Sequence, residues 1–110
     1  MERFVKGDVV VLPFPFTDLS GSKKRPSLVI ASLLGDDVIL CQITSKDKND
    51  SYSIELLDNS FEKGNLPIQS FIRPNRIFTA DKNIIVEKRG HLKNNAIIKV
   101  EEKIIEIIRQ

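Results

Sequence analysis

Apolar residues along most of this chain occur in short runs separated by turn-forming residues, a pattern typical of β-strands. The runs that predict strands are residues 9–12, 28–32, 38–43, 53–57, 77–80 and 84–87. The second and third runs are joined by residues 33–37, a compact hairpin connection, whereas 46–50 and 58–67 read as polar loops. Many short strands with close turns favour a small barrel or sandwich, so the sequence predicts a mainly β fold.

The C-terminal segment follows a different pattern, because its apolar residues recur at helical spacing between residues 96 and 109. Asn94 and Asn95 precede this segment and can cap the start of a helix. The helix should pack on the β-core, and the breadth of its apolar stripe indicates a second contact. The stripe consists of Ile97, Val100, Ile104 and Ile108, widened by Ile98 and Ile105.

The length of 110 residues fits a single domain spanning residues 1–110. Charged residues make up 29% of the chain and hydrophobic residues 41%, as in ordinary soluble globular proteins. A net charge of +2 is too small to indicate a nucleic-acid binder by itself. A chain of this size has a limited core, and self-association would help its stability.

The single cysteine excludes an internal disulfide. Cys41 lies within an apolar run, which favours burial as a small hydrophobic residue. Because Cys41 and the single histidine form no cluster of ligands, the sequence predicts no metal site, and no cofactor is expected. The N-terminus has no apolar signal segment and no stretch approaches a membrane span, so the expected location is the cytoplasm.

The long connection after the first predicted strand ends in Arg25 and Pro26. Pro26 pushes the preceding residue towards an extended backbone, so Arg25 should stand at the start of a strand. A guanidinium offers a rigid fork of donors suited to phosphate. The alternative is a solvated basic turn. The cations that flank predicted strands, and that together can attract phosphates, are Lys23, Lys24, Arg25, Arg73 and Arg76.

The order of motifs along nearly the whole chain resembles that of the MazF/PemK-type toxins. The matching segments are Gly7-Asp8-Val9-Val10, the loop 13–18, Lys24-Arg25-Pro26, residues 28–31, Cys41-Gln42-Ile43-Thr44-Ser45, residues 64–67, residues 70–79, Gly90-His91-Leu92 and the terminal helix. A glycine and an aspartate before a strand would carry no information alone. All of these segments in one order are fairly specific.

The resemblance implies a small SH3-like β-barrel, of the MazF/PemK/CcdB type, with a C-terminal α-helix and a homodimeric assembly. It implies a toxin of a type II toxin–antitoxin system that cleaves single-stranded mRNA selectively and without a metal. The implied partner is an antitoxin whose acidic, partly disordered segment covers the RNA groove, and whose complex with the toxin binds DNA. By the same analogy, Arg25, Thr44 and Arg73 fall on catalytic positions.

Metal-free RNA cleavage uses the ribose 2'-hydroxyl as nucleophile and leaves a 2',3'-cyclic phosphate and a 5'-hydroxyl. A fixed guanidinium at Arg25 would stabilise the charge that develops on phosphorus, and the hydroxyls of Thr44 and Ser45 would position the phosphate. The alternative for both hydroxyls is a turn-forming role at a strand end. The residues expected to bind RNA are Thr17, Asp18, Lys23, Lys24, Ser45, Asn75 and Arg76.

The segment Arg73-Pro74-Asn75 stands where several members of the family carry Arg-Cys-Asp. Asn75 cannot accept a proton as a carboxylate does. Either Asp18 substitutes for that carboxylate or cleavage depends on electrostatic stabilisation alone, and Asp18 could equally cap its own turn. Histidine is the usual general base at neutral pH, but the place of His91 before the helix favours a turn or surface role.

Two other functions compete with RNA cleavage. The related CcdB-type toxins inhibit gyrase by binding and cleave nothing, but they depend on C-terminal aromatic residues that this helix lacks. The other alternative is an SH3-like module that binds peptide or RNA without chemistry.

Overall fold

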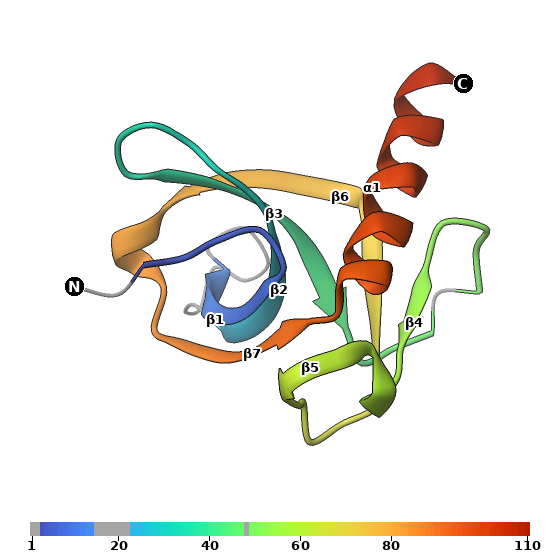
Figure 1. The fold of residues 1–110 in the computed structure, drawn as a ribbon, viewed down its shortest axis with the longest axis horizontal. Coiled ribbons are helices and arrows are strands. Elements are labelled where there is room, and N and C mark those ends of the chain that lie inside the picture. Colours follow the sequence, from blue (N-terminus) through green and yellow to red (C-terminus); the bar gives the residue numbers. More distant parts are fainter. Residues whose placement is uncertain (1–2, 15–22, 48) are drawn as a thin grey trace.

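The computed structural model describes residues 3–14, 23–47 and 49–110 and shows a curled antiparallel sheet with one C-terminal helix (Figure 1). The seven strands follow the order β4-β6-β3-β2-β1-β7-β5. Their bounds are β1 Asp8–Phe14, β2 Lys23–Ser32, β3 Asp37–Thr44, β4 Ile54–Leu56, β5 Phe61–Gly64, β6 Ser70–Asp81 and β7 Glu87–Leu92. Short 3-10 turns cover Asp58–Ser60 and Lys82–Ile84, and the helix α1 covers Asn94–Arg109.

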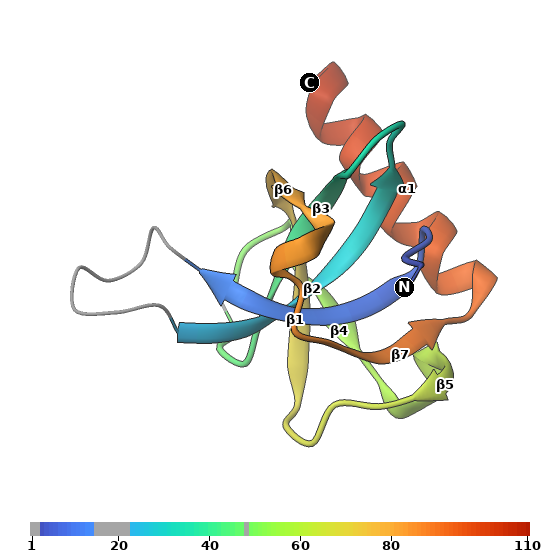
Figure 2. The same ribbon diagram turned by 90° about the vertical axis from the view of Figure 1, so that its left-hand side faces the viewer.

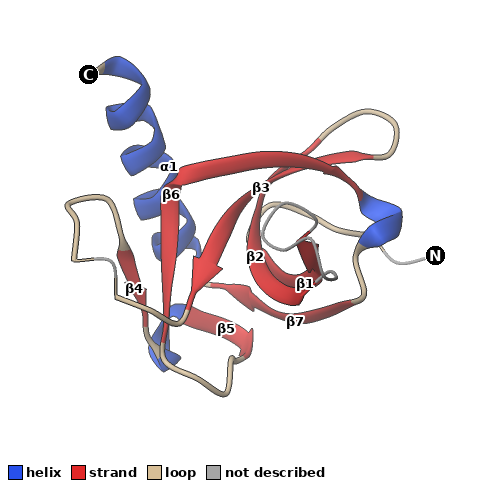
Figure 3. Cartoon of the chain, turned by 180° about the vertical axis from the view of Figure 1, so that it is seen from behind, coloured by secondary structure: helices blue, strands red, loops and turns tan. Residues whose placement is uncertain are grey.

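Irregular register makes the sheet curl. The ladders β1–β7, β2–β3 and β3–β6 each contain a bulge or a shift, and bulges bend strands and increase their twist. The sheet therefore wraps around β1 and β2, with β4 and β5 as its two ends (Figures 2 and 3). The predicted mainly β fold is confirmed, in the form of a half-barrel.

Two apolar clusters hold the fold together, one on each face of the sheet. The first lies between the sheet and α1 and includes Val9, Leu28, Cys41 and Ile72, with Ile97 from the helix. The second lies on the other face of the sheet. It consists of Phe4, Val10, Leu12, Phe14, Val29, Val38 and Leu40. Because side chains alternate along a strand, β1, β2 and β3 contribute to both clusters.

The helix confirms the predicted periodicity but not the predicted cap. Ile97, Val100 and Ile104 are buried against the sheet. The helix already begins at Asn94, and its N-cap residue is Lys93, which makes no side-chain capping bond. The asparagines therefore belong to the first turn of the helix. None of the helices in the described part of the chain is long and apolar enough to cross a membrane.

Three strands differ from the sequence-based prediction. The strand β6 covers Ser70–Asp81 and so begins seven residues before the predicted run 77–80. The other two differences concern β7 and β5. The last strand covers Glu87–Leu92, not 84–87, because this segment pairs with both β1 and β5 while residue 84 closes a 3-10 turn. The strand β5 lies inside the segment 58–67, which reads as a loop. Tertiary pairing overrides local propensity in both places.

Cys41 is fully buried, which confirms its predicted role as a core residue. Burial raises the pKa of its thiol to about 12. The thiol is therefore neutral near neutral pH, in keeping with a packing residue.

We expect Gly7→Ala to destabilise the fold more than Gly35→Ala. Both glycines have positive φ, 98° and 83°, so both substitutions carry backbone strain. A Cβ at Gly7 would also collide with the side chain of Ile97, whereas nothing lies within 4 Å of one at Gly35. Urea unfolding should show a loss at Gly7 larger by about 1–3 kcal/mol, and equal losses would contradict this packing argument.

Candidate functional site

Arg25 lies inside β2, opposite Leu12 of β1, and not in a solvated turn. Its side chain is half-buried, and the neighbouring Pro26 pairs with Val11. The prediction that a strand fixes the backbone of this arginine is confirmed. A guanidinium held in this way has a direction set by the sheet.

The ladder between β2, β3 and β6 brings polar residues from three distant segments onto one face. Ser27 pairs with Gln42, and Gln42 pairs in turn with Arg73. Continued by two residues beyond its last paired position, the β2–β3 register sets Arg25 opposite Thr44. Because residues two apart on a strand share a face, these five residues form one cluster, which we call the polar grid.

Three buried polar atoms of the polar grid have no hydrogen-bond partner among the described residues. They are Arg25 Nε, Ser27 Oγ and Arg73 Nε. Leaving a buried donor unpaired costs about 1–3 kcal/mol, so two such guanidinium groups on one face are a feature that a structural role alone does not explain. Their N–H groups match the acceptor oxygens of an anion such as phosphate.

A groove of about 440 Å³ has two members of the polar grid, Arg25 and Thr44, in its lining, whereas Ser27, Gln42 and Arg73 do not line it. Its basic lining residues come from the start of β2 and from β7, and its hydroxyls from the end of β3 and the start of β6. The polar residues in its lining are Lys23, Lys24, Arg25, Arg89, Thr44, Ser45, Ser70 and Glu87. Its apolar lining includes Val11, Pro26, Ile43, Leu66, Pro67 and Ile68. Cations beside apolar surface suit a chain of phosphates and bases.

Thr44 is buried at the end of β3, with 7% of its surface exposed. Its Oγ1 accepts a hydrogen bond from the Lys46 N–H at 3.2 Å. That bond uses an oxygen lone pair and leaves the hydroxyl proton available for donation. Thr44 therefore has a turn-forming contact and a hydroxyl proton that no described residue accepts.

Arg73 and Arg76 lie on either side of an irregularity in β6, because Cys41 pairs with Ile77 whereas Gln42 pairs with Arg73. Arg76 Nε donates a long hydrogen bond of 3.4 Å to Gln42 Oε1. Asn75 is exposed within this irregular segment and does not line the groove. The position where the resemblance implies a catalytic acid or base, Asn75 in this chain, therefore does not line the groove.

The other residues expected at the site have different outcomes. Thr17 and Asp18 lie outside the described residues. His91 is a strand residue of β7 whose Nδ1 lies 2.8 Å from Asp8 Oδ1, so it is not in a turn.

Five polar residues of the groove and the polar grid are absent from the sequence-based prediction of the site: Ser27, Gln42, Ser70, Glu87 and Arg89. Gln42 interrupts the apolar run 38–43, whereas Ser27 stands just before the run 28–32, and only the register between the strands brings the two together. Glu87 and Arg89 had no signal, because the strand that carries them was placed a few residues too early. Within β7, Arg89 Nε donates to Glu87 Oε1 at 2.8 Å.

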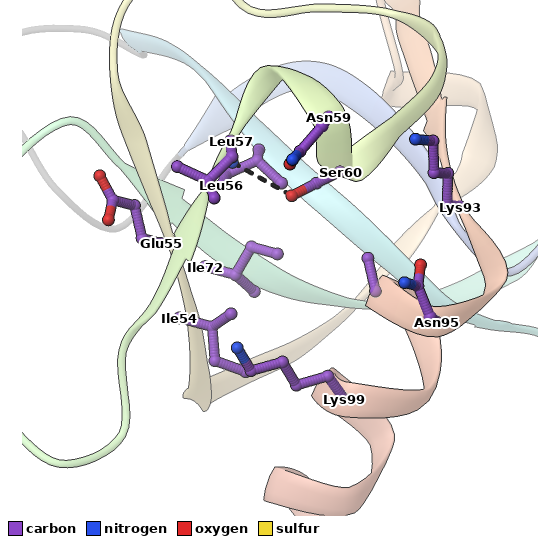
Figure 4. Close-up of a pocket in the computed structure, with 11 residues that line it drawn as sticks. Ile54, Glu55, Leu56, Leu57, Asn59, Ser60, Ile72, Lys93, Asn95 and Lys99 are labelled. Carbon is purple, nitrogen blue, oxygen red and sulfur yellow. Dashed lines mark hydrogen bonds between the residues drawn. The ribbon is translucent and has the colours of Figure 1, made fainter.

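A second cavity, of about 300 Å³, lies between β4, the turn Asp58–Ser60 and the start of α1 (Figure 4). Its lining contains Glu55, Lys93, Asn95 and Lys99 around apolar residues such as Ile54. It includes no residue of the polar grid. It also shares no lining residue with the groove.

Comparison with known proteins places this chain in a family. A family model described as PemK-like, MazF-like toxin of type II toxin–antitoxin system matches residues 5–108. The chain thus belongs to the PemK-like, MazF-like toxins of type II toxin–antitoxin systems. No curated protein sequence is similar enough to add a relative.

Solved structures share the fold at low sequence identity. MazF from Deinococcus radiodurans has a TM-score of 0.78 at 17% identity over 100% of both chains. An endoribonuclease from Mycobacterial species has a TM-score of 0.72 at 15% identity, over 99% of this chain and 94% of that one. A chain of the Deinococcus radiodurans MazE–MazF structure has a TM-score of 0.76 at 17% identity, over 98% and 97%.

Proposed function

We propose that this toxin cleaves single-stranded RNA at the polar grid, by attack of the ribose 2'-hydroxyl on the adjacent phosphorus. The new bond joins the 2'-oxygen to phosphorus, and the bond from phosphorus to the 5'-oxygen breaks. The products are a 2',3'-cyclic phosphate and a 5'-hydroxyl. The observation that carries this proposal is the pair of buried guanidinium Nε atoms, of Arg25 and Arg73, that have no hydrogen-bond partner among the described residues. Arg25 also lines the groove, together with other cations.

Each member of the polar grid has a separate role. Arg25 stabilises the negative charge on the phosphoryl oxygens, in a direction fixed by β2. Thr44 donates its hydroxyl proton to a non-bridging oxygen. Arg73 supplies a second guanidinium from β6. The lysines of the groove, Lys23 and Lys24, contact flanking phosphates and supply affinity.

The reaction should proceed in EDTA, because the nucleophile belongs to the substrate and the charge is stabilised by guanidinium groups. Incubation of the purified protein with a long single-stranded RNA in EDTA should give discrete fragments ending in cyclic phosphate. Intact RNA would favour the gyrase-inhibitor or binding-module alternatives. Activity that EDTA abolishes and magnesium restores would contradict the metal-free mechanism.

The antitoxin partner should present acidic side chains to the same groove, whose lining carries four cations and one carboxylate. Bound antitoxin would then exclude RNA from the groove.

Mapping the ends of the RNA fragments would define the sequence motif at which the toxin cleaves.

We expect Arg25→Ala to slow cleavage by roughly a hundred- to a thousand-fold, as for other pre-organised donors to a developing charge. RNA affinity should fall much less, because the neighbouring cations remain. Arg25→Lys should restore only part of the rate, since an ammonium lacks the planar fork. Single-turnover rates, with protein in excess over RNA and above the Kd of the complex, would measure these effects.

The matched control for the lost charge is Arg109→Ala, an exposed arginine at the end of α1. The Arg109→Ala protein should cleave at the parental rate.

Thr44→Ala should also slow cleavage. If Thr44 and Arg25 act on one phosphate, the double variant with Arg25→Ala should lose less rate than the product of the two single effects. A folded Arg25→Ala protein with the parental rate would show that Arg25 is not the catalytic arginine.

We also propose a homodimer that buries the outer face of α1. On that face Ile98, Ile105 and Ile108 are 45%, 50% and 72% exposed. Light scattering at micromolar concentration should give twice the monomer mass, and Ile105→Asp should reduce it to the monomer. Ile84→Asp is the control, because Ile84 is similarly exposed, at 41%, but lies outside the helix. A parental monomer would contradict the proposal.

A further inference from the structure

A carboxylate from a loop outside the sheet reaches the polar grid. Asp50 lies in the connection between β3 and β4, and its Oδ2 is 3.7 Å from Arg73 Nη2. The Arg73 side chain is 15% exposed and that of Asp50 is 28% exposed. Among the described residues, Asp50 is the acidic residue that forms an ion pair with a guanidinium of the polar grid.

The two oxygens of Asp50 have separate contacts. Oδ1 accepts hydrogen bonds from the backbone N–H of Tyr52 at 3.0 Å and of Ser53 at 2.9 Å, and from Ser53 Oγ at 3.0 Å. These bonds fix the carboxylate within its own loop. Oδ2 remains directed at Arg73. The loop therefore holds the carboxylate before any RNA binds.

We propose that Asp50 is a positioning residue for Arg73, which holds the guanidinium in one orientation towards the phosphate of the RNA. The inference rests on the proposed function of the polar grid. A guanidinium has five N–H donors, and Asp50 faces only one of its terminal nitrogens. The unpaired Nε–H and the remaining donors stay available to a phosphate, while the long side chain loses little further rotamer freedom on binding.

Asp50 is poorly suited to be the missing proton acceptor. The backbone hydrogen bond from Ser53, followed by those from Tyr52 and the Ser53 side chain and by the charge of Arg73, lowers the pKa of its carboxyl below the ordinary value. A carboxylate with a lowered pKa is a weak base at neutral pH. It supplies a fixed negative charge to Arg73, not a proton acceptor in place of Asn75.

The opposite view is that Asp50 competes with phosphate for Arg73, and the two views predict different kinetics. Removing a negative charge from a phosphate site should by itself tighten the binding of RNA. If Asp50 competes, its neutralisation should lower KM and leave kcat intact. If Asp50 orients Arg73, kcat should fall although the site has become more positive.

The decisive variant is Asp50→Asn. It keeps the Oδ1 acceptor for Tyr52 and Ser53, so the loop should remain folded, but it places an amide NH2 where Oδ2 faced Arg73. We expect kcat to fall about ten-fold, as for a misplaced catalytic group, with KM unchanged or lower. Arg73→Ala should cost at least as much, and the double variant should be no slower than Arg73→Ala alone.

The matched control is Asp47→Asn in the same loop. Asp47 Oδ1 also accepts a backbone bond, from the Asn49 N–H at 2.8 Å, and the substitution removes the same charge. It should leave kcat unchanged. A kcat for Asp50→Asn equal to that of Asp47→Asn, or a lower KM at full kcat, would overturn the positioning role.

The test does not depend on cleavage alone. If the parental protein cleaves no RNA, the proposed function fails, but NMR of the Arg73 side-chain nitrogens still reports on its orientation. A guanidinium held by Asp50 should show slowed rotation about its Nε–Cζ bond, and this slowing should be lost in Asp50→Asn and kept in Asp47→Asn. Identical Arg73 spectra in the parental protein and Asp50→Asn would refute the inference independently.

Discussion

The buried carboxylate of Asp8 fixes the strand around which the sheet is assembled. Asp8 is only 2% exposed, and burying a carboxylate is tolerated when its oxygens are paired. Oδ2 accepts from the Val5 N–H at 2.9 Å and lies 3.3 Å from Lys88 Nζ, and Oδ1 lies 2.8 Å from His91 Nδ1. Since a carboxylate can only accept, His91 must carry its proton on Nδ1. The pairing joins the start of β1 to β7 and so closes one side of the curl.

That closure also determines where the groove lies. The strand β1 stands between β2, which carries Arg25, and β7, which carries Glu87 and Arg89. Val11 pairs with Pro26 on one side and with Glu87 on the other. The basic residues of β2 and β7 therefore reach one groove because β1 holds both strands. After β7 the chain turns directly into α1, whose Ile97 packs against Gly7.

Much of the fold could be predicted from the sequence because its strands and its helix bury most of their apolar residues on definite faces. The helix 94–109 and the strands near 9–12, 28–32 and 38–43 have strong local periodicity. The strand β5 could not be predicted, because it has only four residues and pairs with β7 at Gly64 and Gly90, which are far apart in sequence. The shift of β7 has the same cause.

The candidate site was predictable in part for a similar reason. Arg25 is marked by the proline that follows it, and Thr44 by its place at the end of an apolar strand. Ser27 and Gln42 required the register between strands, which no single segment contains. Asp50 is one polar residue among several in its loop, and only the folded chain distinguishes it from Asp47, by the guanidinium opposite.

The irregular segment of β6 explains why the chemistry should depend on hydrogen-bond donors more than on a proton acceptor. Pro74 has no N–H to give to a ladder and is buried in that segment, while Asn75 beside it is exposed. The residue where the family resemblance places an acid therefore lies outside the paired ladder, whereas Arg25 and Arg73 lie within it. Donors held by a sheet need no reorganisation as charge develops on the phosphate, and this is the condition under which electrostatic stabilisation is most effective. The two guanidinium groups of the proposed site thus stand in paired strands, and a polar amide stands at the position that the resemblance gives to an acid.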